Sequence, residues 1–301
     1  MDLGTNTFHL LITEYSNSAL HEIVHEHDAV KLGEGGINKG LILPAAFERG
    51  VKSMQHFNGL IQDNKVQHIR AIATSALRNA ANGMDFIREV KDRTNITIEI
   101  IDGDAEATYI YKGVKASGCL SKQNSLIVDI GGGSVEFIIC NAHEILWKQS
   151  FEIGAARLMD KFHRTDPIPA ESITELNQYL DNCLKDLFTA AQQYTIDNLV
   201  GSSGVFESYA EVMERKKGNP FNLKKIKHFE FVKDELLSLI EKLALSTHQQ
   251  RIATEGIIPV RIDMIVVASL LTRFIMEKLG IDKVVMSTSS LKEGVLAEMM
   301  G

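Results

Sequence analysis

Three consecutive glycines between two acidic residues form the segment of this sequence best suited to chemistry. The segment, Asp129-Ile-Gly-Gly-Gly-Ser-Val-Glu136, follows a short apolar run, 126–128. Consecutive glycines let the backbone approach a ligand closely and point several N–H groups at it, an arrangement that suits phosphate oxygens. Asp129 could hold a hydrated Mg²⁺, which prefers one or two carboxylates plus phosphate oxygens, and Glu136 could share that metal or orient a water. The alternative is a hairpin that simply needs glycines.

A similar segment, Asp2-Leu-Gly-Thr-Asn-Thr-Phe-His9, begins the chain. Each segment has an acidic residue, a glycine turn and a hydroxyl residue, followed by an apolar, strand-like run. The first segment alone fits an ordinary turn as well as a phosphate loop, and His9 is interpreted as a core histidine. The repetition predicts two similar lobes that face each other across a cleft. Only Met1 precedes Asp2, so we expect that a few native N-terminal residues are missing from this sequence.

Two junctions between a strand and a helix carry further polar residues. In the segment 73–83 a helix begins near Ser75, where its N-terminus could bind an anion, and Arg78 could fork onto a phosphate. An ordinary N-cap with a surface arginine explains this segment equally well. In the segment 100–111, Glu106 falls in the first turn of a helix. It could stabilise the helix dipole or accept a proton from an attacking water, and the sequence leaves both roles open.

Short β-branched runs alternate with longer helical ones, which predicts an α/β protein. We expect strands at 68–73, 96–101, 125–129 and 284–286, and helices at 44–61, 105–116, 172–191 and 261–278. A chain of 301 residues favours two domains. The polar stretch 117–124 places their boundary, which gives an N-terminal lobe, 1–120, and a C-terminal lobe, 121–301.

Composition excludes several classes of protein. The net charge of −7 argues against general nucleic-acid or acidic-membrane binding. No apolar run approaches the roughly 18 residues that a membrane span needs. The three widely spaced cysteines form neither a disulfide framework nor a metal-type pair, so we expect a reducing cytoplasm. The segment 215–227 has six basic residues and no acid. It could attract a polyanion electrostatically or be a solvated connector, and the connector is favoured.

Together, six segments resemble the exopolyphosphatase/guanosine pentaphosphate phosphatase (Ppx/GppA) family, within the actin-like, sugar-kinase and heat-shock ATPase superfamily. Each is a weak signal alone, but they occur in the family's order from one end of the chain to the other. The segments are Asp2-Leu-Gly-Thr-Asn-Thr-Phe-His9, Ala73-Thr-Ser-Ala-Leu-Arg-Asn-Ala80, Gly103-Asp-Ala-Glu-Ala107, Val128-Asp-Ile-Gly-Gly-Gly-Ser-Val-Glu-Phe137, Gly201-Ser-Ser-Gly204 and Leu291-Lys-Glu-Gly-Val-Leu296.

The resemblance implies two ribonuclease-H-like lobes with the active site in the cleft between them. It matches Glu106 to a catalytic glutamate that activates water, and Asp129 and Glu136 to an acidic pair at the phosphate and metal site. It also implies phosphate or substrate contacts in two glycine-containing loops, one helix start and one further loop: Gly4, Thr5, Asn6, Gly131, Gly132, Gly133, Ser134, Ser75, Arg78 and Ser203. Ala105 stands where many relatives carry a second acid. The chain resembles the short, two-domain form, without the helical C-terminal domains associated with extended polymer binding.

We therefore expect an exopolyphosphatase that uses Mg²⁺ to hydrolyse the terminal phosphoanhydride of inorganic polyphosphate. Guanosine pentaphosphate (pppGpp) ends in the same bond and is the nearest alternative substrate. A superfamily ATPase or kinase is more remote. A non-catalytic sensor of polyphosphate or of an alarmone is the least favoured, because all three carboxylates are present. The helix at 261–278 could pack within its lobe or across a homodimer.

Overall fold

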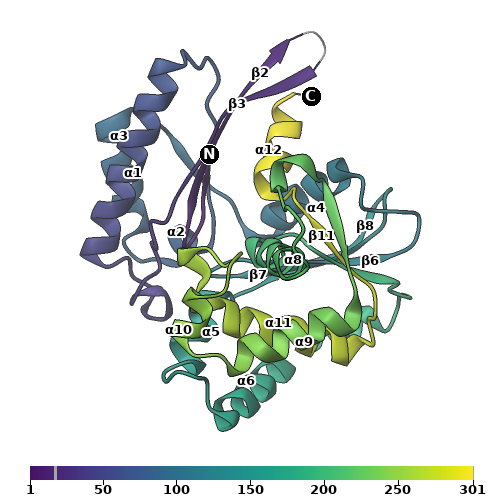
Figure 1. Cartoon of the computed structure of the whole chain (residues 1–301). Helices are drawn as coiled ribbons and strands as arrows, with labels where there is room; N and C mark the ends of the chain where they lie inside the picture. The colour runs from purple at the N-terminus through teal and green to yellow at the C-terminus, as the bar shows by residue number, and fades with distance from the viewer. Residues whose placement is uncertain (17–18, 301) are drawn as a thin grey trace. The chain divides into compact units, whose positions relative to one another are not determined.

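The structure is a computed structural model that describes residues 1–16 and 19–300 (Figure 1). The chain divides into two compact units, Met1–Gly103 and Asp104–Gly301. Each unit has its own β-sheet, its own hydrophobic core and its own helices.

The N-terminal unit has a five-stranded sheet in the order β3-β2-β1-β4-β5. Strands β1 to β3 pair antiparallel, whereas β4 and β5 run parallel to β1. Alternate residues of β2 turn their side chains into the core, where Phe8 lies against Phe86 of α3. The elements are β1 (Asp2–Leu3), β2 (Phe8–Ser16), β3 (Ala19–Asp28), a 3₁₀ turn (Ile37–Lys39), α1 (Pro44–Asp63), β4 (Ala71–Ala73), α2 (Ser75–Asn79), α3 (Gly83–Thr94) and β5 (Ile98–Ile100).

The C-terminal unit has a six-stranded sheet in the order β10-β11-β9-β6-β7-β8. Its strands are β6 (Ser125–Ile130), β7 (Val135–Cys140), β8 (Ile145–Phe151), β9 (Asn198–Gly201), β10 (His228–Phe231) and β11 (Val284–Ser287). Its helices are α4 (Gly103–Ser117), α5 (Ala155–Phe162), α6 (Ala170–Cys183), α7 (Lys185–Ala191), α8 (Gly204–Lys216), α9 (Lys233–Leu245), α10 (His248–Ile252), α11 (Met264–Leu279) and α12 (Leu291–Met299), with 3₁₀ turns at Leu223–Lys225 and Pro259–Arg261.

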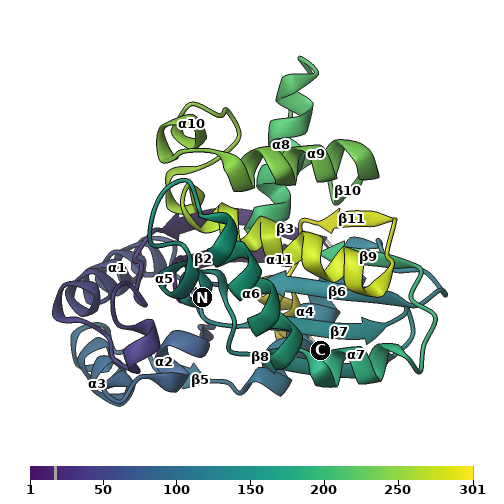
Figure 2. The same ribbon diagram turned by 90° about the horizontal axis from the view of Figure 1, so that it is seen from below.

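Helices cover both faces of this second sheet. Leu126, Val128 and Ile130 of β6 share a core with α5, α6, α9 and α11. Because successive strand residues point to opposite faces, Asp129 lies on the other face. In Figure 2, α6, α7 and α11 lie in front of the sheet and α4 lies behind it.

The two sheets share one connectivity. Strand β10 adds an antiparallel edge strand beside β11 in the second sheet. With β10 left out and the other strands of each unit counted in chain order, both sheets run third-second-first-fourth-fifth. This is the ribonuclease-H-like order, so the predicted α/β class with two such lobes is confirmed. The predicted cleft between the lobes stays a prediction.

The domain boundary differs from the prediction. The division falls after Gly103, rather than at 120, so α4 groups with the C-terminal unit. The reason is a close crossing of α4 and α12: a Cβ on Gly113 would lie 2.0 Å from the Ser290 carbonyl oxygen. At the same crossing, a Cβ on Gly294 would lie 1.8 Å from the carbonyl oxygen of Tyr109, and the Tyr109 hydroxyl donates to Glu298 at 2.6 Å.

Two predicted helices also differ from the structure. The helix expected at 172–191 is two helices, because Leu184 leaves the helical conformation (φ −100°, ψ 19°) with its side chain in the core. The helix expected at 261–278 begins at Met264, and Arg261 belongs to the preceding 3₁₀ turn. Helix α11 is largely buried in its own unit, so it packs within the lobe.

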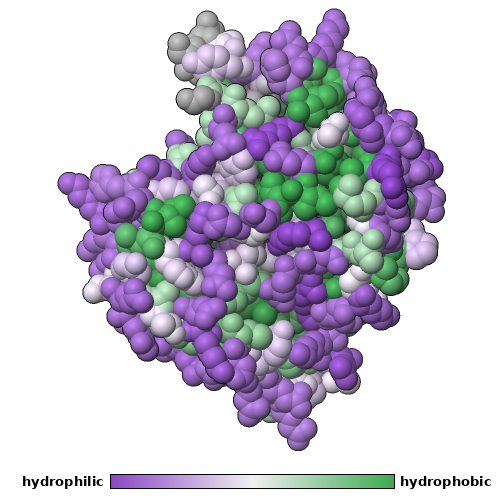
Figure 3. Space-filling view, turned by 180° about the vertical axis from the view of Figure 1, so that it is seen from behind, coloured by the Kyte–Doolittle hydropathy of each residue, from purple (hydrophilic) through white to green (hydrophobic). Residues whose placement is uncertain are grey.

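In the part of the chain that the structure describes, no helix is long and apolar enough to cross a membrane. On the face shown in Figure 3, hydrophobic residues lie among more numerous hydrophilic ones. The basic segment 215–227 runs from the last turns of α8 toward β10. In it, Arg215 pairs with Glu211 at 2.7 Å and Lys217 with Glu235 at 2.7 Å, which fits a connector better than a segment that attracts a polyanion.

The crossing of α4 and α12 yields a stability prediction. Gly113→Ala forces the two backbones apart, and overpacking of this kind costs about 1–3 kcal/mol of unfolding free energy. Gly59→Ala is the matched control, because a Cβ at Gly59 of α1 meets no atom within 4 Å. Urea unfolding followed by circular dichroism measures both. Equal unfolding midpoints for the two variants would contradict the tight crossing.

Candidate active site

The carboxyl ends of three parallel strands gather polar residues at one edge of the C-terminal sheet. Strands β6, β9 and β11 run parallel, and Asp129 lies near the end of β6. The Ser202 hydroxyl, directly after β9, donates to Asp129 Oδ2 at 2.8 Å. The Ser290 hydroxyl, between β11 and α12, donates to the same oxygen. In open α/β sheets, ligands bind at this edge.

A second polar row crosses β6, β7 and β8. Asp129 lies directly opposite Glu136, and Glu136 lies directly opposite Ser150. Residues directly opposite each other in antiparallel strands share a face with Cβ atoms about 4.5–5.5 Å apart. The Ser150 hydroxyl donates to Glu136 Oε1 at 2.6 Å, and the Glu136 side chain is almost wholly buried. The two acids of the glycine segment are therefore adjacent.

Glu106 reaches the same face from helix α4. It lies in the first turn of α4, is only 6% exposed, and interacts electrostatically with Glu136. Asp104, also in this first turn, accepts a hydrogen bond from Lys148 of β8 at 2.8 Å, which ties the start of the helix to the sheet. The structure thus brings together the three carboxylates Glu106, Asp129 and Glu136.

Burial makes Asp129 and Glu136 weaker acids than usual. Burial raises the pKa of Asp129 to about 6, although the Ser290 and Ser202 hydrogen bonds oppose the rise. Burial, followed by the charges of Glu106 and Asp129, raises the pKa of Glu136 well above its ordinary value. A cation beside the two acids would favour the ionised form of both.

The donor set fits Mg²⁺. Among residues 1–16 and 19–300 no three His, Cys, Asp or Glu side chains form a metal cluster. Mg²⁺ needs fewer protein ligands than that, because it is bound through one or two carboxylates plus waters and substrate phosphates. Asp129 and Glu136 are the residues that would hold it, since they are adjacent, share a face and repel each other when ionised.

Helix α5 determines how the glycine loop is oriented. The N–H groups of Ala155, Ala156 and Gly154 donate to the carbonyl oxygens of Gly131, Gly132 and Gly133 at 2.8, 2.9 and 3.2 Å, in that order. A trans peptide directs its N–H opposite to its C=O, so the N–H groups of Gly132, Gly133 and Ser134 point away from α5. Because α5 packs on the opposite face, they point toward the side that carries Asp129 and Glu136. Such a row of N–H groups can bind an anion.

The remaining predicted residues of the N-terminal unit form their own group. Gly4, Thr5 and Asn6 turn from β1 into β2, and the Gly4 N–H donates to the Thr7 carbonyl at 3.1 Å. Strands β1 and β4 are parallel neighbours, so Ser75, at the end of β4, lies at the same sheet edge as this loop. Arg78 donates to the Ile101 carbonyl at 3.0 Å, which ties α2 to the end of β5.

A model of the Ppx/GppA phosphatase family matches residues 11–301. The chain belongs to this family. The predicted family and the predicted class of enzyme, a phosphatase, are confirmed.

Members and neighbours of the family differ in length and in named substrate. The crystal structure of an exopolyphosphatase from Cytophaga hutchinsonii has 40% sequence identity and a TM-score of 0.96, with 99% of this chain and 96% of that one covered. An Aquifex aeolicus Ppx/GppA protein shares the fold at 22% identity and a TM-score of 0.81, with 99% and 95% covered. A guanosine-5′-triphosphate,3′-diphosphate pyrophosphatase of Vibrio vulnificus is 27% identical over 100% of this chain, but the chain spans only 58% of that relative's length.

Some residues of the Ppx/GppA site escaped the sequence prediction. Ser150, Ser202 and Ser290 bind the acidic pair, and their positions opposite a known acid or just after a parallel strand are the available signals. Arg261 packs against the start of α8: its guanidinium lies over Gly204, where a Cβ would meet it at 1.9 Å, and it pairs with Glu207 at 3.0 Å. No signal marked it, because the residue was expected inside a helix.

Ser203 is the last of the predicted residues. It precedes α8 as the N-cap residue, and its hydroxyl makes no hydrogen bond to the helix. Its Oγ is buried, and the described part of the chain offers it no hydrogen-bond partner. A buried hydroxyl of this kind at a helix N-terminus is suited to an oxygen-rich ligand.

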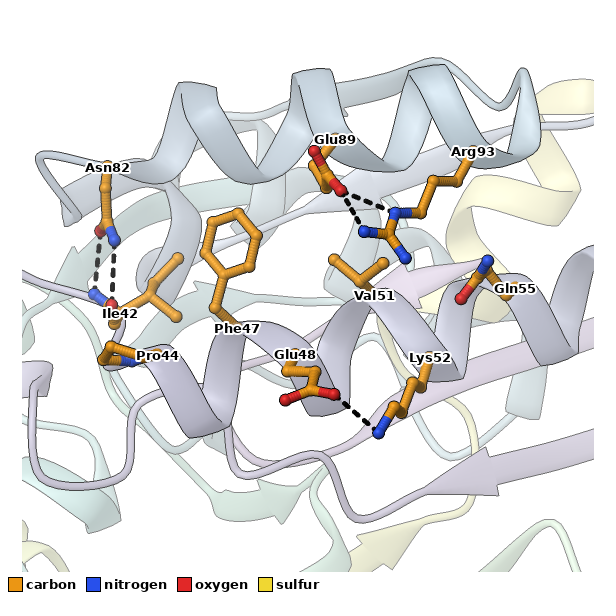
Figure 4. A pocket seen from close by; sticks show the side chains of 10 residues that line it. All are labelled: Ile42, Pro44, Phe47, Glu48, Val51, Lys52, Gln55, Asn82, Glu89 and Arg93. Carbon is orange, nitrogen blue, oxygen red and sulfur yellow. Dashed lines mark hydrogen bonds and ion pairs between the residues drawn. The ribbon is translucent and has the colours of Figure 1, made fainter.

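The hollow between α1 and α3 is a different feature of the surface (Figure 4). It measures about 480 Å³, and Phe47 and Val51 lie between the two helices. Its charged residues pair within each helix, Lys52 with Glu48 and Arg93 with Glu89. It contains none of the predicted site residues, so it is not a candidate active site.

The raised pKa of Asp129 predicts an unusual dependence of stability on pH without metal. Because the folded pKa, about 6, exceeds the ordinary 3.8, the folded state binds more protons than the unfolded state between these values. The contribution of Asp129 to stability is therefore fully present below pH 3.8 and is lost as the pH rises through 6. Asp129→Asn removes the loss and should raise the unfolding free energy at pH 7 by about 1–3 kcal/mol.

Urea unfolding at several pH values between 4 and 7, in buffer with chelator, measures this difference. Asp92→Asn, which changes an exposed aspartate of α3, controls for the general loss of negative charge. If Asp129→Asn is no more stable than Asp92→Asn at pH 7, the ionised carboxylate of Asp129 does not destabilise the folded protein.

Proposed function

We propose that this chain is a Mg²⁺-dependent exopolyphosphatase that hydrolyses the terminal phosphoanhydride of inorganic polyphosphate. The observation that carries the proposal is the meeting of Glu106, Asp129 and Glu136 beside a glycine loop whose N–H groups face the same side. Its similarity to the Cytophaga exopolyphosphatase, over nearly the whole length of both chains, supports polyphosphate as the substrate.

Glu106 is the proposed base in this reaction. A carboxylate in the first turn of α4, buried beside two other acids, is well placed to orient a water and to accept its proton. The N–H groups of Gly132, Gly133 and Ser134 bind the terminal phosphate. In the N-terminal unit, the loop 4–6, Ser75 and Arg78 are proposed to bind further phosphate oxygens, and Ser203 one more.

Asp129 and Glu136 are the proposed Mg²⁺ ligands. A Mg²⁺ held by these two residues would supply charge neutralisation at the phosphate oxygens. Ser202 and Ser290 occupy Oδ2 of Asp129, and this leaves Oδ1 as the oxygen available to a ligand.

Guanosine pentaphosphate is the second candidate substrate. It ends in the same type of bond, and the Vibrio vulnificus relative is named for it. The Cytophaga exopolyphosphatase has the higher sequence identity to this chain, 40% against 27%, and this favours polyphosphate.

The cytoplasm stays the expected compartment. Cys119, Cys140 and Cys183 are all free thiols, which is typical of a protein in a reducing environment. A homodimer stays a prediction.

Phosphate release from long-chain polyphosphate, guanosine pentaphosphate and ATP, measured in parallel, tests the proposal. With Mg²⁺ we expect release to be fastest from polyphosphate, and a chelator should abolish it. Glu106→Gln should lower kcat by about 10²–10⁴-fold, the usual contribution of a general base. Glu144→Gln is the control, since it makes the same change at an exposed position.

Near-normal turnover in Glu106→Gln would remove Glu106 from the mechanism. Faster phosphate release from guanosine pentaphosphate than from polyphosphate would make guanosine pentaphosphate the preferred substrate. Binding of polyphosphate without any phosphate release would instead identify a sensor.

Direct metal binding gives an independent test. The electron paramagnetic resonance signal of free Mn²⁺, used in place of Mg²⁺, reports binding without any turnover. Asp129→Asn should weaken Mn²⁺ binding by at least about tenfold, because it removes a charged ligand. Asp92→Asn should bind Mn²⁺ like the wild type, and unchanged binding in Asp129→Asn would place the metal elsewhere.

A further inference from the structure

We propose that Arg157 is a positioning residue that holds the glycine loop in its anion-binding orientation. Arg157 lies in the first turn of α5. The inference rests on the proposed function, because it concerns the loop to which the terminal phosphate is assigned.

The contacts of Arg157 reach into the loop itself. Its Nε donates to the carbonyl oxygen of Gly133 at 2.8 Å, and its Nη2 donates to Glu152 Oε2 at 2.8 Å. The side chain is only 14% exposed, whereas Glu152 is 44% exposed. The guanidinium is therefore enclosed at the loop and anchored by one carboxylate on its outer side.

The Gly133 carbonyl differs from the two before it. The carbonyls of Gly131 and Gly132 accept from the N–H groups of Ala155 and Ala156, whereas that of Gly133 accepts from both Gly154 and Arg157. A peptide unit is planar, so fixing this carbonyl also fixes the N–H of Ser134. A positive donor on the carbonyl polarises the same peptide and strengthens its N–H as a donor. Arg157 thus acts on the last N–H of the row.

The position of Arg157 in its helix supports a role beyond stability. The first turn of a helix carries a partial positive charge and favours acidic residues. A cation placed there is unfavourable for the helix alone. The ion pair with Glu152 is open to solvent on the Glu152 side, where water weakens it. The hydrogen bond to the loop carbonyl is a contact that favours an arginine here in spite of the helix dipole.

The test is the hydrolysis of polyphosphate by Arg157→Met, together with the binding of tripolyphosphate by calorimetry in the presence of chelator. Loss of a charged hydrogen bond at the loop should raise both KM and the tripolyphosphate Kd by about tenfold. Because no reacting atom is touched, kcat should change less than about twofold. Arg157→Lys keeps the charge but loses the directed Nε contact, so it should recover only part of the affinity.

Lys161→Met is the matched control. Lys161 lies one turn along α5, carries the same charge, and contacts the rings of Tyr179 and Phe162 rather than the loop. Its removal should leave KM and Kd unchanged. Circular dichroism of each variant shows whether the protein remains folded. If Arg157→Met does not fold, Arg157→Lys is the variant to use.

Unchanged KM and Kd in a folded Arg157→Met protein would overturn the positioning role, as would a loss confined to kcat. An equal loss in Lys161→Met would attribute the effect to the general charge of α5. A wild-type protein that binds tripolyphosphate but hydrolyses nothing would refute the proposed function alone. The calorimetric Kd of the variants for tripolyphosphate would then still test the role of Arg157.

Discussion

Everything at the edge of the C-terminal sheet depends on the burial of like charges. Asp129 and Glu136 face each other across two strands, and Glu106 approaches them from a helix, with little water to screen the repulsion. The serines that donate to the pair come from three different strands or their ends, and so the whole sheet contributes to stabilising two carboxylates. The hydroxyl groups stabilise the two carboxylates without cancelling their charge. The buried acid pair is thus the physical basis for the proposed metal site.

The two units show how one connectivity can support two local chemistries. In each unit an aspartate of the first strand is followed by a tight glycine turn and a return strand, and one residue of the return strand lies directly opposite the aspartate. That residue is His9 in the N-terminal unit and Glu136 in the C-terminal unit. Only the second pair creates a concentration of negative charge. The turn is therefore shared, whereas the proposed metal site depends on the acid at the opposing position of the second unit.

The sequence was most informative where the chemistry is local. The acids and glycines of 129–136 lie within eight residues of one another, so their spacing already marked them as one candidate site, and the structure places the two acids opposite each other. The serines that complete the site are 73 and 161 residues from Asp129, and no short-range pattern links them. The boundary prediction at 120 was displaced for the same reason. Helix α4 belongs to the second unit through Gly113 and Gly294, which become neighbours only after folding. Likewise, Leu184 interrupts a continuous helical pattern because the core accommodates its side chain where the chain bends.

The glycine contact between α4 and α12 has a mechanical consequence. Side chains at a helix interface can change rotamer and so absorb small displacements, but two backbones in direct contact have no such freedom. Helix α4 carries Glu106, and Ser290, which holds Asp129, immediately precedes α12. A shift of either helix is therefore transmitted directly to the other. Glu106, proposed to activate water, and Ser290, which binds Asp129, are therefore expected to move together.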